Sequence, residues 1–279
     1  MKLLHGFLAV AIAALAGACA SVPPPPPPVV DSMARTVDGV RLDPQAKIDP
    51  ALLSEALASY ARHYGTVKEK TVYFDFPDRR VESQMSPIGR DVIGVIDFRI
   101  PATRPRFFIV DLHSGAVAAF RVAHGRNSDA GGDINTTGPV MTTGGAVRAS
   151  NLLDTNESSV GAYVAANVYE GRFDLGAVRL HGLDDTNSCV FWRAIVMHQA
   201  RYMTPDPATG VVGTSDGCLA VEVEQRPIVS GYIANGGFVY AGPVSLHVPS
   251  AADGARSQSA CEAVRLKPEN GPQPPLPGS

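Results

Sequence analysis

GTSDGCLAV, at residues 213–221, carries a cysteine out of a small, polar turn and straight into an apolar run. Glycines bracket the turn, and the apolar residues that follow Cys218 are typical of a short buried strand. Three interpretations of Cys218 are open on this stretch alone: half of a disulfide, a buried filler, or a nucleophile. The rest of the chain is needed to choose between them.

The body of the chain has the pattern of a mainly β (α+β) fold with few helices. The 279 residues include 27 glycines and 23 prolines, which predicts many turns. From about residue 90, short apolar runs alternate with Pro, Gly and Ser turns, as in DVIGVIDFRI, RFFIVDL, AVRLHGL and RAIVMHQA. The segment IVDLHSGAVAAFRV predicts a β-hairpin over the turn His113-Ser114-Gly115.

Two helices are predicted at the ends of this body. In DPALLSEALASYARHYG, Asp49 can cap the helix and Pro50 suits its first turn, and apolar residues follow at helical spacing, which indicates an N-terminal packing helix. A short helix near RPIVSGYIA is expected to end at NGG, before the strand FVYAG. One domain is therefore predicted over residues 49–247.

The two ends of the chain read as segments outside the fold. Residues 1–19, with Lys2 followed by LLHGFLAVAIAALAGA, have the pattern of a secretory signal peptide. AGAC predicts a lipobox that ends in a lipidated Cys19, and plain cleavage at the A-x-A-like Ala18-Cys19-Ala20 is the alternative. Residues 20–48 form a proline-rich linker that favours a stiff polyproline II spacer, and residues 248–279 a flexible tail. We therefore expect export to the periplasm or cell envelope as a membrane-anchored lipoprotein.

The charge pattern argues against one class of partner. Twenty-four Lys and Arg residues against 27 Asp and Glu residues give a formal net charge of −3, without a basic stripe. Nucleic-acid binding requires a concentrated positive surface, so no nucleic-acid partner is expected.

A reactive cysteine needs a base and donors for developing negative charge. His198 ends the apolar run AIVMH, and the loop-forming QARYMTPDPATGVVG can return the chain so that Cys218 lies beside it. Gly217 allows a tight turn that brings amide groups close to a substrate carbonyl, and Ser215 can fix that turn. His124 and His181, which also close short strands, are interpreted as structural histidines. Spacing alone still leaves a structural Cys218 open.

VMHQARYM…GTSDGCLAV resembles the HG…SxGC signature of the YkuD-like L,D-transpeptidases of bacterial cell walls, most of all the murein L,D-transpeptidase catalytic domain-like branch. GVIDFRIPATRPRFFIVDL, VAHGRNSD, SNLLDTNESSVGAYVAANVYEG, LHGLDDTNS and FWRAIVMH are similar to that branch in order and spacing. The resemblance covers roughly residues 50–242. It implies a β-sandwich or barrel catalytic domain and an acyl-transfer reaction.

By this resemblance, Cys218 attacks the carbonyl of the third residue of a peptidoglycan stem peptide and expels the terminal D-alanine. His198 takes the thiol proton and protonates the leaving amine, and amides at Gly217 and Cys218 form the oxyanion hole. The acyl-enzyme then passes to an amine, which forms a cross-link, or to water, which trims the stem. The resemblance implies no metal or cofactor, and the sequence carries no HExxH or paired CxxC motif.

The chain departs from the family at positions next to these residues. Gln199 follows the histidine where the family has Gly, and Asp216 lies between Ser215 and Gly217, where relatives carry an aromatic residue or His. A carboxylate beside the nucleophile opposes formation of the thiolate unless it points away. The departures keep a second hypothesis open: an envelope lipoprotein with the same fold that binds peptidoglycan and turns over weakly or not at all.

Further roles are assigned around this centre. Substrate contact is predicted for four residues: Arg193, Ser159, Tyr163 and Gln199. Pairing at the surface is the alternative for Arg193, and strand packing is the alternative for Ser159 and Tyr163. If Cys19 is lipidated, three cysteines remain in an oxidising compartment, and pairing Cys189 with Cys261 leaves Cys218 as the free thiol.

Overall fold

The structure, a computed structural model, describes residues 48–65, 71–74, 80–83, 87–130, 140–170 and 176–246. The predicted signal peptide, the C-terminal tail, Cys19 and Cys261 lie outside the described residues, as does the predicted linker except for its last residue, Ile48. No helix within the described ranges is both long and apolar enough to cross a membrane.

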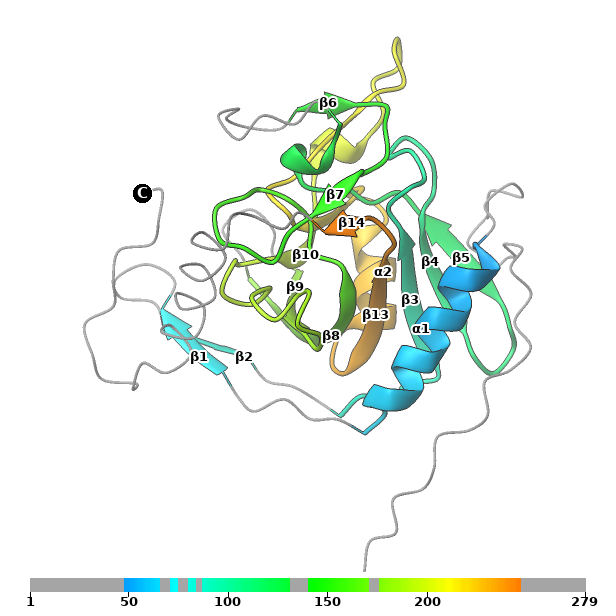
Figure 1. The fold of residues 1–279 in the computed structure, drawn as a ribbon, viewed down its shortest axis with the longest axis vertical. Coiled ribbons are helices and arrows are strands. Elements are labelled where there is room, and N and C mark those ends of the chain that lie inside the picture. The colour runs from blue at the N-terminus through cyan, green and yellow to red at the C-terminus, as the bar shows by residue number, and fades with distance from the viewer. Residues whose placement is uncertain are drawn as a thin grey trace, which may run out of the picture.

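One eight-stranded sheet forms the centre of the fold (Figure 1). Its strands in spatial order are β12 (Leu219–Val221), β10 (Val196–Gln199), β9 (Ala177–Gly182), β8 (Gly161–Tyr169), β13 (Gly237–Gly242), β3 (Val92–Asp97), β4 (Phe107–Asp111) and β5 (Val117–Phe120). The pairs β10–β12 and β13–β3 are parallel, and the other neighbours are antiparallel. The predicted mainly β fold is therefore confirmed.

Three two-stranded sheets complete the β structure of the described residues, which also include two short 3-10 helices. The pairs are β1 (Thr71–Phe74) with β2 (Arg80–Ser83), β6 (Met141–Thr142) with β11 (Val212–Gly213), and β7 (Arg148–Ala149) with β14 (Ser245–Leu246). The 3-10 helices are η1 (Arg126–Ser128) and η2 (Arg201–Met203).

The predicted N-terminal helix is present as α1 (Pro50–His63). The Asp49 carboxylate accepts hydrogen bonds from the amides of Ala51 and Leu52, at 2.8 and 3.2 Å, which satisfies donors that the first turn leaves without a partner inside the helix. The second helix, α2 (Arg226–Ile233), is followed as expected by the NGG turn, in which Asn235 and Gly236 have positive φ angles. Strand β13 follows directly.

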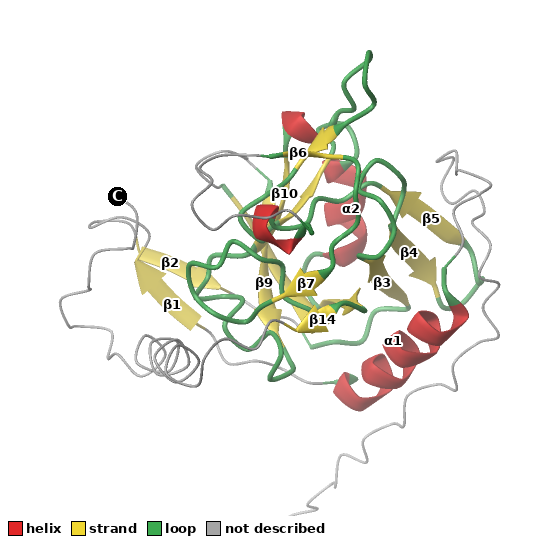
Figure 2. Ribbon diagram, turned by 45° about the horizontal axis from the view of Figure 1, so that its top comes forward, coloured by secondary structure: helices red, strands yellow, loops and turns green. Residues whose placement is uncertain are grey.

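The two helices lie on opposite faces of the sheet (Figure 2). Because successive side chains of a strand point to opposite faces, β4 contributes Phe107 and Ile109 to the core beneath α2, and Phe108 and Val110 to the core beneath α1. Both faces of the central strands are buried, which explains why these strands read as continuous apolar runs rather than as alternating ones.

The hairpin predicted over residues 113–115 is also confirmed, since β4 and β5 pair in antiparallel register. The Asp111 carboxylate accepts hydrogen bonds from the amides of His113 and Ser114, at 2.8 and 2.9 Å, and Gly115 takes a φ of +71°.

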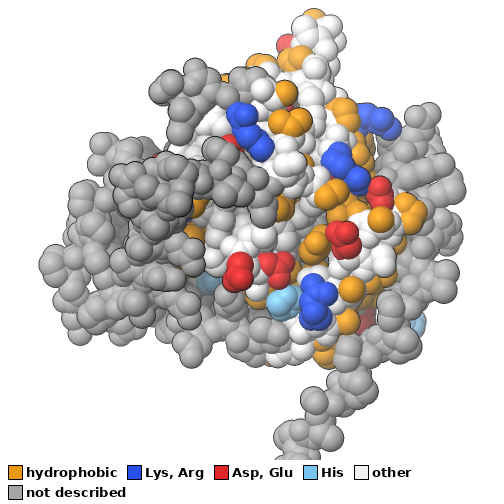
Figure 3. All heavy atoms as spheres, viewed as in Figure 1, with side chains coloured by type: hydrophobic (Ala, Val, Ile, Leu, Met, Phe, Trp, Pro, Cys, Tyr) orange, Lys and Arg blue, Asp and Glu red, His pale blue; other side chains and the backbone are white. Residues whose placement is uncertain are grey.

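On the face of the molecule seen in Figure 3, positive and negative side chains of the described residues are interspersed.

Candidate active site

The candidate site lies where β10 and β12 run side by side at one edge of the eight-stranded sheet. Their parallel register pairs Met197 with Leu219 and His198 with Ala220, and Cys218 directly precedes β12. Cys218 is therefore offset by two residues from the partner of His198. Strands ~4.8 Å apart that rise ~3.3 Å per residue place the two Cα atoms ~8 Å apart, with both side chains on one face of the sheet. That spacing is within reach of a thiol and an imidazole.

The Cys218 side chain is a free, half-buried thiol. Its Sγ donates to the backbone carbonyl of Ala194, with the sulfur and the oxygen 3.6 Å apart. Ala194 itself has a φ of +53°, an unusual conformation for a residue with a side chain, and this turns its carbonyl towards the sulfur. The thiol is thus held in place while part of it stays open to solvent.

The His198 ring is oriented by the main chain of the next residue. Its Nδ1 lies 2.8 Å from the carbonyl oxygen of Gln199. A carbonyl only accepts hydrogen bonds, so Nδ1 carries the proton, and Nε2 is the basic nitrogen of the neutral ring. The departure to Gln at position 199 leaves this contact intact, because the backbone rather than the side chain makes it.

Ser215 holds the turn that leads into Cys218. Its Oγ donates to the Cys218 carbonyl at 2.7 Å and accepts from the Gly217 amide at 3.2 Å. The amide of Ser215 donates to the carbonyl of His124 at 2.9 Å, which ties the turn to the neighbouring segment. The expectation that Ser215 fixes this turn therefore agrees with its geometry.

Gly217 occupies a position that no other residue fits without strain. Its φ is +112°, and a Cβ on it would lie 2.8 Å from the Glu157 carbonyl oxygen and 3.4 Å from an Arg193 nitrogen. The Gly217 amide is directed at Ser215, so within this structure it is not aimed at a substrate. The Gly217 amide, which was expected to stabilise an oxyanion, therefore donates its hydrogen bond inside the turn instead.

Asp216, the carboxylate expected to oppose a thiolate, forms an ion pair with Arg126. The Asp216 side chain is 66% exposed, whereas that of Arg126 is 10% exposed and fixed in η1. The amide of Arg126 also donates to the Ser215 carbonyl at 2.7 Å. The pair compensates the negative charge two residues before Cys218, a contact that sequence spacing does not reveal.

Arg193 lies beneath the turn and contacts loop 150–160, which joins β7 to β8. Nη1 donates to the Ser150 carbonyl and to Ser159 Oγ, both at 2.6 Å, and Nη2 donates to Thr155 Oγ1 at 3.2 Å and to the Glu157 carbonyl at 2.6 Å. Burial lowers the pKa of Arg193 to about 10, so the guanidinium stays charged at neutral pH. These contacts engage both terminal nitrogens with the protein itself.

Ser159 and Tyr163, predicted to contact substrate, have no exposed surface. Ser159 Oγ donates to the Ser150 carbonyl at 3.0 Å, and the Tyr163 hydroxyl donates to the Ser159 carbonyl at 2.6 Å. Burial is the largest of the effects that raise the pKa of Tyr163. This placement favours a packing role, and substrate contact by the two residues stays a prediction.

A buried polar chain that the sequence did not reveal supports the back of the site. Arg106 Nη2 lies 2.7 Å from His124 Nδ1, and His124 Nε2 lies 2.7 Å from Asp129 Oδ1. Arginine only donates, so Nδ1 accepts and Nε2 donates to the carboxylate. Burial lowers the pKa of His124 below its ordinary value and that of Arg106 to about 9. His124 is therefore a neutral structural histidine, as expected.

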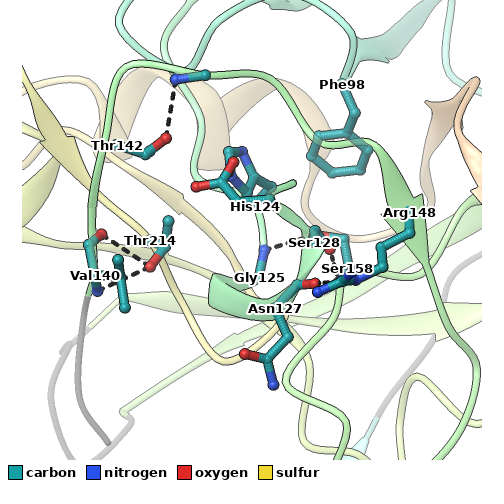
Figure 4. A network of polar contacts seen from close by, with 12 residues as sticks. Phe98, His124, Gly125, Asn127, Ser128, Val140, Thr142, Arg148, Ser158 and Thr214 are labelled. Atoms are coloured by element: carbon teal, nitrogen blue, oxygen red, sulfur yellow. Dashed lines mark hydrogen bonds and ion pairs between the residues drawn. The ribbon is translucent and has the colours of Figure 1, made fainter. Parts of the chain in front are cut away.

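Backbone and hydroxyl contacts join this region to loop 150–160 (Figure 4). The Gly125 amide donates to Ser158 Oγ, and the Ser158 amide donates to Ser128 Oγ, each at 2.9 Å. Arg148 Nε donates to the Asn127 carbonyl at 2.6 Å. The segment that pairs with the Cys218 turn is thus fixed from both sides.

Tyr202, in η2, is a further residue beside the nucleophile that sequence reasoning missed. Its ring packs against Gly213, where a Cβ would lie 2.7 Å from the tyrosine Cβ. Burial, followed by the charges of Cys218 and Asp216, raises the pKa of Tyr202. The phenol therefore remains protonated. In the sequence, only the spacing His-x3-Tyr after His198 could have pointed to Tyr202.

The cysteines differ in state. Cys189 is disulfide-bonded, with its partner outside the described residues, and Cys218 is free. Because Cys261 is not described, its pairing with Cys189 stays a prediction. Over the described part of the chain, no three His, Cys, Asp or Glu side chains are grouped closely enough to hold a metal ion.

These features define a class of site: an oriented imidazole on β10 and a free thiol directly before the parallel strand β12, with a glycine of positive φ in the turn that leads to the thiol. A family model described as the L,D-transpeptidase catalytic domain matches residues 67–241, more than half of the chain. The chain belongs to this L,D-transpeptidase family. Its family supports a peptidoglycan-modifying L,D-transpeptidase activity.

Solved structures similar to this chain include three L,D-transpeptidases of Mycobacterium tuberculosis. L,D-transpeptidase 1 is 12% identical, over 60% of this chain and 67% of its own, with a TM-score of 0.30. L,D-transpeptidase 3 is 16% identical, over 56% and 62%, with a TM-score of 0.28. A further L,D-transpeptidase is 16% identical, over 70% and 86%, with a TM-score of 0.29. The chain thus spans about two thirds of the first of these, and none of the curated proteins matches it in sequence.

Proposed function

We propose that this chain is an exported cysteine L,D-transpeptidase that acts on peptidoglycan stem peptides through an acyl-enzyme on Cys218. One observation carries the proposal: the free Cys218 thiol lies on the same sheet face as His198, whose Nδ1 is held by the Gln199 carbonyl. An imidazole fixed in this tautomer presents Nε2 as a base, which is what a thiol nucleophile requires.

The first half-reaction forms the acyl-enzyme. His198 Nε2 accepts the thiol proton as Sγ bonds to the carbonyl carbon of the third stem residue, and the carbonyl electron pair moves onto oxygen. The tetrahedral intermediate then collapses and breaks the C–N bond to the terminal D-alanine. The imidazolium returns its proton to the leaving amine, so that a thioester and neutral His198 remain.

The oxyanion of this intermediate needs hydrogen-bond donors near Cys218. The Gly217 amide donates to Ser215 instead, so we assign the donor role at this turn to the Cys218 amide. Ser215 and Gly217 then act by shaping the turn: Ser215 Oγ fixes the Cys218 carbonyl, and Gly217 supplies the φ of +112°.

In the second half-reaction, an amine of another stem or a water molecule attacks the thioester. His198 Nε2 takes a proton from the attacking group, the C–S bond breaks, and the proton returns to the thiolate. An amine acceptor yields a cross-link, and water yields a stem shortened by one residue. The pair Asp216–Arg126 compensates the carboxylate two residues before Cys218, and this supports an active thiol rather than an inactive binding protein.

We assign the protein to the periplasm or cell envelope on the sequence alone. The pattern of residues 1–19 supports export, and AGAC supports lipidation of Cys19. The proline-rich linker over residues 20–48 would then hold the catalytic domain away from the membrane. Mass spectrometry of the mature protein, with and without a lipidated N-terminal cysteine, tests this assignment.

The decisive experiment incubates the purified protein with defined tetrapeptide muropeptides and analyses the products. We expect release of D-alanine together with cross-linked or trimmed stems, and no release by Cys218→Ala. His198→Gln should lower turnover by about 10²- to 10⁴-fold, the usual contribution of a general base. His113→Gln, at the hairpin turn at the opposite end of the sheet, is the matched control and should keep wild-type turnover.

Two outcomes decide against the proposal. Binding of muropeptides without any product favours the peptidoglycan-binding lipoprotein, and wild-type turnover in Cys218→Ala rejects the nucleophile. A carbapenem that acylates thiols offers an independent probe. It should add its mass to the wild-type chain, and Cys218→Ala should stay unlabelled.

A further inference from the structure

Arg193 occupies a place that the proposed reaction does not use. It lies in the turn between β9 and β10, and its guanidinium donates four hydrogen bonds to loop 150–160, each to an uncharged oxygen. A planar guanidinium suits such a set of acceptors, whereas an ammonium has no matching fork.

The loop that Arg193 holds contains two strained residues. Asp154 and Asn156 have φ angles of +60° and +54°, although neither is a glycine. Such conformations cost about 1–3 kcal/mol each and persist only where the surroundings impose them. The four acceptors of Arg193 lie before, between and after these two residues in the loop. The guanidinium is therefore well placed to impose this shape.

The same loop presses against the turn of the nucleophile. The Glu157 carbonyl, which accepts from Arg193 Nη2, would lie 2.8 Å from a Cβ on Gly217, and Nη2 itself would lie 3.4 Å from it. The residue after Arg193 is Ala194, whose carbonyl receives the Cys218 thiol. Arg193 and its neighbour therefore bound the Gly217-Cys218 segment on two sides.

Arg193 also brings positive charge to this place. Its guanidinium interacts electrostatically with Cys218, and the other titratable groups that face it are Tyr163, Glu157 and Asp154. Glu157 in turn pairs with Arg148 at 3.2 Å.

We propose that Arg193 is a positioning residue for the nucleophile: its fork holds loop 150–160 against Gly217 and thereby fixes the turn that carries Cys218. The inference deepens the proposed function and rests on Cys218 being the reactive group. It replaces substrate binding as the role of Arg193, because both terminal nitrogens are already engaged.

The test compares Arg193→Lys, which keeps the charge and loses the fork, with Arg193→Gln, which loses both. Two properties of the full chain are measured: deuterium exchange of the segment 213–221, and turnover of tetrapeptide stems. Arg148→Lys and Arg148→Gln are the matched controls. Arg148 contacts the same loop through the Glu157 carboxylate and also bonds the Asn127 carbonyl.

We expect Arg193→Gln to speed up exchange in 213–221 and to lower turnover by about 10- to 100-fold through misplacement of the thiol. Arg193→Lys should show the same two effects, because an ammonium cannot replace the fork that holds the loop. The Arg148 variants should keep the wild-type exchange of 213–221.

The outcomes separate this inference from the proposed function. If the wild-type chain never turns over stems, the proposed function is wrong, while deuterium exchange of 213–221 still tests the positioning role of Arg193. If Arg193→Gln does not fold, faster exchange of 213–221 in folded Arg193→Lys supports the inference, and unchanged exchange overturns it. Equal effects in the Arg148 variants also overturn it, because loosening of the loop alone would then explain the result.

Discussion

The two ends of the eight-stranded sheet are stabilised in different ways. At the β4–β5 end, the hairpin turn is held by its own residues: the Asp111 carboxylate accepts from His113 and Ser114, two and three positions along the chain. At the β10–β12 end, the turn before Cys218 is held by His124 and Arg126, each at least 90 positions away. One end is built locally, and the other is assembled from distant segments.

This difference bears on the chemistry of the site. A local hairpin forms the same turn wherever its sequence is placed, whereas the conformation of the Cys218 turn depends on the whole fold. Gly217, Ser215 and Asp216 each contact a segment that lies outside the turn. We therefore expect the geometry of the Cys218 turn to be lost together with global packing. The hairpin turn does not depend on global packing in this way.

The largest expected effect comes from Arg106, which supports the site end from within. Arg106→Leu removes the donors to the buried Val122 carbonyl and His124 Nδ1, and to the part-buried Ile100 carbonyl. Breaking a buried charged network in this way costs about 3–5 kcal/mol of unfolding free energy. Urea denaturation measures the loss. The exposed Arg104→Leu, two residues away, should change stability by no more than about 0.5 kcal/mol.

A smaller effect separates the two ends directly through their glycines. Gly217→Ala faces both a φ of +112° and a Glu157 oxygen 2.8 Å from the new Cβ, whereas Gly115→Ala has a φ of +71° and nothing within 4 Å. We expect about 2–3 kcal/mol of lost stability and no turnover for Gly217→Ala, and about 1 kcal/mol with intact Cys218 alkylation for Gly115→Ala. Equal losses in the two variants would contradict the comparison.

The smallest effect is a difference in pH dependence. The pKa of His124 is lowered from 6.5, chiefly by burial, so the unfolded chain binds this proton more readily than the folded one. Its contribution is therefore present above pH 6.5 and is lost as the pH falls below that value. For Asp111, hydrogen bonds outweigh burial and lower the pKa from 3.8, so its contribution is lost only in more acidic solution.

Urea denaturation at pH 7.5 and pH 5.5 measures this difference. Wild-type protein should lose stability between the two values, and His124→Gln, which can accept from Arg106 and donate to Asp129, should lose less. Asp111→Asn is the hairpin control and should follow the wild-type slope over this interval. A His124→Gln slope equal to that of the wild type would show that another group titrates.

The same contrast explains what the sequence could predict. The helix α1 and the β4–β5 hairpin follow from nearby residues, since Asp49 caps the first and Gly115 turns the second. The family resemblance identified His198 and Cys218 as the candidate pair, and the parallel register of β10 and β12 brings their positions together. In each case, the signal lies in a short motif.

The contacts that surround the pair could not be predicted in this way. Arg126 reaches Asp216 across 90 positions and Arg193 reaches Glu157 across 36, and no local pattern links the members of either pair. Predictions for Ser159 and Tyr163 relied on their match to a family stretch near the site, but β8 is buried on both faces from Ala162 to Ala166, and Ser159 in the loop before it is buried too. Sequence spacing gives position along a strand, and burial depends on what packs over it.

The carbonyl that orients His198 has a consequence for residue 199. Because a peptide oxygen fixes the ring, the tautomer of the base does not depend on which side chain the following residue carries. Position 199 can therefore carry other side chains without loss of the contact that orients the imidazole. In the proposed reaction, such changes would alter which stems or acceptors fit beside the sulfur.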